Sequence, residues 1–61
     1  MTLQGLHKYC VEKAKQHPQH FVDIHSFYDL AEMEVQGGSS ESHECDLALN
    51  DIEELINSKE K

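Results

Sequence analysis

We predict an all-α fold: an antiparallel helical hairpin with an additional short N-terminal helix, a small three-helix arrangement in a single domain (residues 1–61). Two observations carry this prediction. Apolar residues recur at steps of three and four, which is the helical period. The segment Gly37-Gly38-Ser39-Ser40 separates two such apolar stripes. From the stripes we expect helices over about residues 3–16, 19–36 and 40–57.

The first expected helix, residues 3–16, has one apolar stripe. Thr2 is placed to cap its start, because a threonine hydroxyl accepts a hydrogen bond from a free amide of the first turn. Pro18 disfavours helical geometry at His17 and suits the first position of a new helix, so a sharp junction follows. This helix either covers the hairpin or packs on a second copy of the chain. The stripe consists of Leu3, Leu6, Cys10 and Ala14, with Val11 beside it.

The second expected helix, residues 19–36, is the first arm of the hairpin. Its acidic residues fall mostly opposite its apolar stripe, as in a surface helix that faces a core. Gly37-Gly38 ends it, because glycine reaches the left-handed conformation after a helix without strain. The stripe consists of Phe21, Ile24, Phe27, Tyr28, Ala31 and Val35, widened by Leu30.

The third expected helix, residues 40–57, is the second arm. Ser39 or Ser40 can cap it, and acidic residues in its first turns suit the positive end of the helix dipole. A four-residue linker makes the two arms antiparallel neighbours. The polar tail, residues 57–61, is expected to fray. The stripe consists of Cys45, Ala48, Leu49, Ile52, Leu55 and Ile56.

The net charge of −7 is unevenly distributed. Residues 1–20 hold three lysines and one glutamate, whereas residues 21–58 hold ten acidic side chains and no lysine or arginine. Direct binding to nucleic acid is therefore disfavoured, because phosphates would be repelled. No apolar run approaches the roughly 18 residues that a membrane span needs. With polar residues 1–16 giving no secretory signal, we expect a cytoplasmic protein with reduced thiols.

A metal site is the first chemical alternative. His7 and Cys10 share a helix face, and His17 or Cys45 would have to complete a zinc site. His17 and His20 have the same spacing across Pro18. Because the CxxC and HExxH patterns are absent, we predict no metal or other cofactor and keep a small zinc-binding protein as an alternative. The simpler interpretation makes both cysteines small buried hydrophobes and places the histidines mostly at the junction and on exposed faces.

An enzyme is the second chemical alternative. A nucleophilic pair, Cys10 with His7 or Cys45 with His43, would need a third orienting group and a cleft. A helical domain of 61 residues has little volume for a pocket of ordinary size. We therefore expect no enzymatic activity and no catalytic residue.

Two sets of residues are candidate partner contacts. The acidic set lies at helical spacing and forms either a solvated face or a docking surface for a basic partner. At the extreme, such a surface mimics nucleic acid and sequesters a DNA-binding protein. The apolar set falls off the main stripes and would serve a partner or a second copy if exposed. The acidic set is Glu41, Glu44, Asp51 and Glu54, and the apolar set is Tyr9, Val22, Met33 and Leu47.

The stretch from Phe21 to Ile56, which contains FYDLAEMEVQGGSSESHECDLALNDIEELI, also resembles a family of phage proteins. It is similar to the small helical accessory proteins encoded between exo and xis in the early region of lambda-like temperate phages. The resemblance implies a non-enzymatic early protein that acts on host or phage factors in the host cytoplasm. Such proteins are associated with host cell-cycle progress and with the lysis–lysogeny balance. The family implies no catalytic or ligand residues at positions of this chain.

The composition and the helical pattern predict a non-enzymatic acidic protein-interaction module, and the resemblance implies an early phage regulator that binds a host or phage protein. Only 38% of the residues are hydrophobic, so the core must be thin, and homo-oligomerisation remains open.

Overall fold

The computed structural model describes residues 1–59 and contains three α-helices in that range. They are α1 (Leu3–Gln16), α2 (Phe21–Gln36) and α3 (Glu41–Lys59), and a single-turn 3-10 helix, η1 (Pro18–His20), joins α1 to α2. The described residues contain no strand. The predicted all-α fold with three helices is therefore confirmed.

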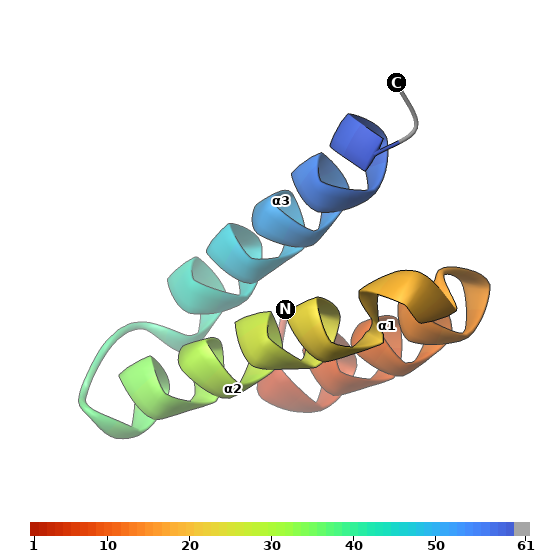
Figure 1. Ribbon diagram of the computed structural model, residues 1–61. Coiled ribbons are helices and arrows are strands. Elements are labelled where there is room, and N and C mark those ends of the chain that lie inside the picture. Colours follow the sequence, from red (N-terminus) through yellow and green to blue (C-terminus); the bar gives the residue numbers. More distant parts are fainter. Residues whose placement is uncertain (60–61) are drawn as a thin grey trace.

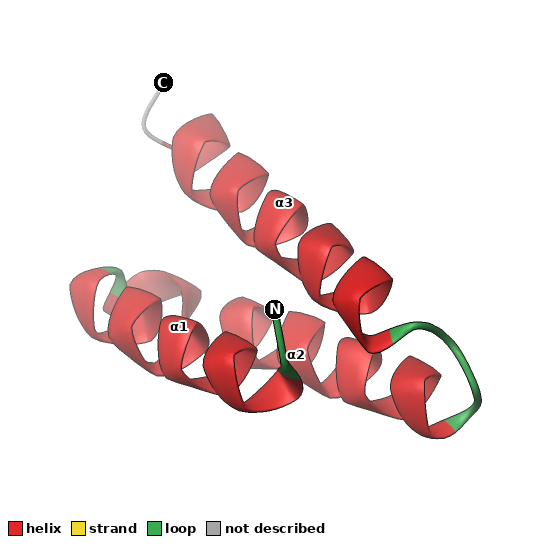
Figure 2. Cartoon of the chain, turned by 180° about the vertical axis from the view of Figure 1, so that it is seen from behind, coloured by secondary structure: helices red, strands yellow, loops and turns green. Residues whose placement is uncertain are grey.

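Helix α2 is the centre of the arrangement. It packs on α1 on one side and on α3 on the other, whereas α1 and α3 make fewer contacts with each other (Figure 1). Figure 2 shows the same order from behind, with green loops only at the chain start, at the short junction and between α2 and α3. The principal extents of the molecule are 35 × 18 × 17 Å. Each helix therefore keeps one long side open to solvent.

The start of α1 and its junction with α2 follow the local chemistry of the sequence. The Thr2 hydroxyl accepts a hydrogen bond from the Gly5 amide at 3.1 Å, as expected for a capping residue. After α1, Pro18 opens η1, and the His20 amide donates to the His17 carbonyl at 2.9 Å. Helix α2 therefore begins at Phe21, two residues after the expected start, because the tight turn uses residues 18–20.

The turn between α2 and α3 is closed by a Schellman motif. Gly38 has a φ of +112°. Its amide donates to the Val35 carbonyl at 3.1 Å, and the Ser39 amide donates to the Glu34 carbonyl at 3.0 Å. These two bonds satisfy carbonyls that the helix end leaves free. The predicted left-handed glycine after the helix is therefore confirmed at Gly38.

Helix α3 begins with a serine cap. The Ser40 hydroxyl accepts a hydrogen bond from the His43 amide at 3.4 Å, and the Ser40 carbonyl accepts from the Glu44 amide at 3.0 Å. The helix continues to Lys59, two residues beyond the expected end. Residues 57–59 of the tail that was expected to fray are thus helical, because they extend a turn that buries Ile56. The remainder of that tail, residues 60–61, lies outside the described residues.

The core lies where the stripes of the three helices meet. It contains no large aromatic ring, and its largest fully buried side chains are Leu6, Ile24 and Ile52. A thin core of this kind agrees with the low hydrophobic content. The buried core residues are Leu6, Cys10, Ala14, Ile24, Ala31, Cys45, Ala48, Ile52 and Ile56.

Two residues assigned to the core stripe of the second helix are exposed instead. Phe21 is 54% exposed and Leu30 is 55% exposed, so these two assignments are wrong. Phe21 is the first residue of α2, next to the end of α1, and its ring packs on His25 with the ring centroids 4.6 Å apart. Leu30 faces the side of the hairpin that is lined by α2 and α3 alone. The period places both side chains near the stripe, but no helix covers them.

Candidate interaction surface

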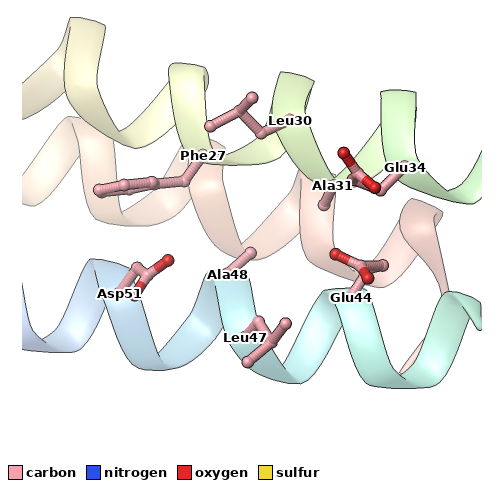
Figure 3. Close-up of a pocket in the computed structure, with 8 residues that line it drawn as sticks. All are labelled: Phe27, Leu30, Ala31, Glu34, Glu44, Leu47, Ala48 and Asp51. Carbon is pink, nitrogen blue, oxygen red and sulfur yellow. The ribbon is translucent and has the colours of Figure 1, made fainter. Parts of the chain in front are cut away.

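An open hollow of about 310 Å³ runs between α2 and α3 (Figure 3). We call it the α2–α3 groove. No residue of α1 lines it, so α1 and the groove use different surfaces of the hairpin. The groove is lined by Phe27, Leu30, Ala31, Glu34, Glu44, Leu47, Ala48 and Asp51.

Helical spacing in both arms brings these residues to one side. Each arm contributes apolar residues in the middle of the groove, and Ala31 of α2 and Ala48 of α3 form its floor. Both alanines are nearly fully buried, whereas Leu30 and Leu47 stand above them and are about half exposed. Because alanine has the smallest side chain of the apolar residues, the two backbones leave space between the leucines. The result is an apolar floor between two raised apolar side chains.

The rim of the groove is acidic. Glu34 comes from α2, whereas Glu44 and Asp51 come from α3. Figure 3 shows Glu34 and Glu44 at one end of the groove and Asp51 at the other end, near Phe27. No lysine or arginine lines the groove, and residues 21–58 contain neither. The three carboxylates therefore have no cationic side chain beside them within the groove.

A second hollow, of about 410 Å³, continues the groove along α3. The two hollows share Phe27 and Asp51, and the second one adds Glu54, Leu55 and Ser58. On α3 the lining runs from Glu44 to Ser58, 14 residue steps, or about 21 Å at the helical rise of about 1.5 Å per residue. The combined surface is about four helical turns long.

The four acidic residues predicted as partner contacts separate into two groups. Glu44 and Asp51 line the groove and Glu54 lines its extension, so these three lie on one side of α3. Glu41 does not join them, because its Oε2 atom accepts a hydrogen bond from the Leu3 amide at 2.6 Å. This hydrogen bond connects the start of α3 to the start of α1. Its carboxylate thus already has a partner within the chain.

The four apolar residues predicted as partner contacts also differ from one another. Val22, Met33 and Leu47 are exposed, but only Leu47 lines the groove. Tyr9 is partly buried against the core, and the Lys13 ammonium lies 5.6 Å from the centre of its ring. Tyr9 therefore does not form part of an exposed apolar patch.

Sequence reasoning missed five of the eight residues of the groove. Glu34 was assigned to the solvated back of the helix, and the other four were assigned to the core stripes: Phe27, Leu30, Ala31 and Ala48. Their spacing held a signal, because residues three, four and seven apart share one side of a helix. What the spacing does not reveal is that no other helix covers that side.

Both cysteines are fully buried and free, which confirms their interpretation as small core residues. Burial, together with the neighbouring Cys45 thiol, raises the pKa of Cys10 to about 11. Burial and the Glu41 carboxylate also raise the pKa of Cys45. A thiol activated for nucleophilic attack has a lowered pKa and partial exposure, so both environments are the opposite of what such a nucleophile needs.

The histidines are dispersed. The His7 ring meets the Tyr28 ring edge-on at 5.2 Å, and the His17 and His20 rings are 6.4 Å apart at the junction, where His20 is buried. Within residues 1–59, no group of three or more His, Cys, Asp or Glu side chains is arranged to hold a metal ion. The three ligands considered for zinc, His7 and Cys10 with His17 or Cys45, are therefore not arranged as a metal site in the described part of the chain.

Two further findings concern the chain as a whole. In the described part of the chain, no helix combines the length and the apolar character that crossing a membrane requires. Comparison of the chain with protein-family models, with curated proteins and with solved structures finds no match.

Proposed function

We propose that this chain is a non-enzymatic, acidic protein-interaction module that binds another protein through the α2–α3 groove. In keeping with the resemblance described above, the proposal includes a role as an early accessory regulator of a lambda-like phage. Its partner is then a host or phage protein in the host cytoplasm.

One observation carries this proposal: exposed apolar side chains and uncompensated carboxylates share one elongated groove. Leu30 and Leu47 are exposed by about half, although burial of such side chains is favourable. Three carboxylates border them without a nearby cation. Exposed apolar surface with a charged rim is typical of binding sites for other proteins. The charge would accelerate encounter with a basic partner, and the apolar floor would supply the contact.

Among the alternatives, mimicry of nucleic acid has less support than a groove for a protein. A mimic needs a surface dominated by regularly spaced negative charge, whereas the middle of this groove is apolar. The alternatives also differ in a measurable way, because a mimic competes directly with DNA for its target. An interaction groove leaves the partner's DNA binding intact unless the two sites overlap.

The test is capture of bacterial proteins from lysate on the tagged full chain, at low and at high salt, with identification by mass spectrometry. We expect one protein to be enriched at low salt and reduced at about 500 mM salt, where charge attraction is screened within a few ångströms. Addition of DNA separates a mimic from an interaction groove. Recovery of no protein beyond the chain itself, at any salt concentration, would contradict the proposed function.

A further inference from the structure

We infer that the α2–α3 groove receives an amphipathic helix whose apolar ridge is flanked by basic residues at both ends. This inference rests on the proposed function and specifies the chemistry of the partner. It is carried by the shape of the groove and by the position of its carboxylates. It is also carried by the poor fit of the chain's own surfaces, a second groove or helix α1, to this groove.

The shape of the groove suits a helix. Helix α1 packs on another surface of the hairpin, mainly on α2, and the groove is an open trough between α2 and α3. The Ala31–Ala48 floor lets a helix approach closely, and Phe27, Leu30 and Leu47 stand on either side of it. The groove and its extension measure about 21 Å along α3, which matches a partner helix of about 14 residues. A helix laid in an apolar groove is a recurring mode of peptide recognition.

The carboxylates specify where the partner carries its positive charge. Glu34 and Glu44 form one acidic end, and Asp51, followed by Glu54, forms the other. Glu44 and Asp51 are seven residues apart on α3, about 10.5 Å at the helical rise. A partner helix that lies along α3 therefore carries Lys or Arg about seven residues apart, with apolar residues three and four positions after the first one. In that arrangement both charges meet carboxylates while the apolar pair covers Ala31 and Ala48.

A second copy of this chain fits the groove poorly. A two-fold arrangement of groove on groove brings Glu34, Glu44 and Asp51 of each copy together, which is repulsive. The basic helix α1 is no better as an occupant. Its open side carries Lys8, Glu12 and Lys15, and it lacks exposed apolar residues to cover the floor. Nucleic acid is repelled by the same carboxylates. The charge of the groove thus selects a foreign, basic helix.

The experiment is a selection of displayed peptides of about 14 residues, the length of the groove, on the immobilised full chain. The peptides are built on an alanine-rich helical scaffold and are randomised on one face. We expect enriched sequences to carry basic residues about seven positions apart that flank two apolar residues. Enrichment of acidic, uncharged or non-helical peptides, or of none at all, would overturn the inference.

Groove variants then locate the binding of one selected peptide, measured by fluorescence anisotropy. We expect the charge-removing double variant E44Q/D51N to weaken binding about fivefold, in line with exposed ion pairs. We expect Leu47→Ser to weaken it about tenfold, because apolar contact at the centre of the groove is lost. Circular dichroism establishes that each variant keeps its helices.

Matched controls remove the same groups elsewhere. The double variant D46N/E53Q neutralises two exposed carboxylates of α3 outside the groove, and Met33→Ser removes an exposed apolar side chain of α2 outside it. Both should bind the peptide like the unchanged chain. If the controls weaken binding as much as the groove variants do, the peptide binds elsewhere and the inference is wrong.

Sedimentation of the chain alone tests whether a second copy of the chain occupies the groove. A dimer that Leu47→Ser dissociates would assign the groove to a second copy and overturn the inference. Failure of the inference is distinguishable from failure of the proposed function. If groove variants such as Leu47→Ser reduce lysate capture but no basic amphipathic peptide is selected, the groove binds a partner of other chemistry and the inference alone fails. If capture succeeds and the groove variants leave it unchanged, the chain binds proteins through another surface and the proposed function fails as well.

Discussion

At the scale of single residues, the buried thiol of Cys10 has a consequence for stability at alkaline pH. The folded protein holds the proton of this thiol up to a pKa of about 11, whereas the ordinary thiol pKa is 9.0. The unfolded chain therefore loses this proton at lower pH than the folded protein does. The stabilisation is fully present below pH 9 and is lost as the pH rises toward 11.

We predict that the free energy of unfolding falls by on the order of 2 kcal/mol through this pH window because of Cys10. The measurement is urea unfolding of the unchanged chain and of Cys10→Ala across the window. The variant should lose part of the pH dependence. Leu6→Ala is the control, because it truncates another fully buried core residue without removing a titrating group. Identical pH profiles for Cys10→Ala and the unchanged chain would contradict the prediction.

The two glycines of the turn after α2 form a matched pair. Gly38 has a φ of +112°, whereas Gly37 has a φ of −80° and space for a methyl group 3.5 Å from two carbonyl oxygens. Gly38→Ala should destabilise the protein by about 1–2 kcal/mol, because L-residues avoid positive φ. Gly37→Ala should stabilise it by about 0.5 kcal/mol through the lower entropy of the unfolded chain. Thermal unfolding of both variants measures these two changes in stability. Two changes of the same sign would contradict the prediction.

At the scale of helices, Glu41 connects two helix starts. Its carboxylate lies in the first turn of α3 and accepts the hydrogen bond from Leu3 in the first turn of α1. Negative charge is favourable at both positive helix ends, and the bond also satisfies an amide that α1 cannot pair internally. Glu44 shares the first turn of α3 but faces the groove. Comparing substitutions at Glu41 and Glu44 therefore separates the effect of the helix dipole from the effect of the contact between helices.

We predict that Glu41→Ala lowers the free energy of unfolding by about 1 kcal/mol more than Glu44→Ala does, because it also removes an interhelical hydrogen bond. Chemical unfolding of both variants provides the comparison. Amide exchange in the first turn of α1 should accelerate in Glu41→Ala alone. Equal exchange in both variants would show that α1 does not depend on this contact.

The helices themselves were predictable from the sequence, because periodicity, the proline at position 18 and Gly37-Gly38 are local signals. Helix α1 was predicted with the bounds that it has, and the serine cap of α3 and the glycine after α2 are confirmed. The start of α2 was misplaced, because the 3-10 turn at Pro18 depends on how α1 and α2 pack.

Burial was less predictable than helix position. Ile24 and Leu30 both fall on or beside the apolar stripe of α2, but only Ile24 is covered by neighbouring helices. Which side of the hairpin α1 occupies is decided by packing between distant segments, and no local pattern contains it. For the same reason three of the four predicted acidic residues lie together along the groove, whereas Glu41 turned out to bind α1.

At the scale of the whole molecule, the acidic charge of α2 and α3 opposes folding. The described residues of this segment contain ten carboxylates and no lysine or arginine up to residue 58. Packing α2 against α3 brings these charges closer than they are in the unfolded chain, so self-repulsion increases on folding. Salt screens this repulsion, and the Debye length falls from about 30 Å at 0.01 M to about 8 Å at 0.15 M.

We therefore predict that the melting temperature rises as sodium chloride is added over this range. The double variant E44Q/D51N should melt at a higher temperature in low salt and respond less to added salt. Thermal unfolding followed by circular dichroism measures both effects. A melting temperature that falls with added salt would indicate that attraction between α1 and the acidic arms outweighs the repulsion.

The order of the helix contacts along the chain also determines how the molecule folds. Helices α1 and α2 are neighbours in sequence, as are α2 and α3, and most packing joins these pairs. Proteins dominated by such local contacts fold in microseconds to milliseconds. The bond from Leu3 to Glu41 spans 38 residues, so closing it costs more chain entropy than the contacts between neighbouring helices do. We therefore expect the first turn of α1 to gain this partner last, after α1 and α3 have both packed on α2.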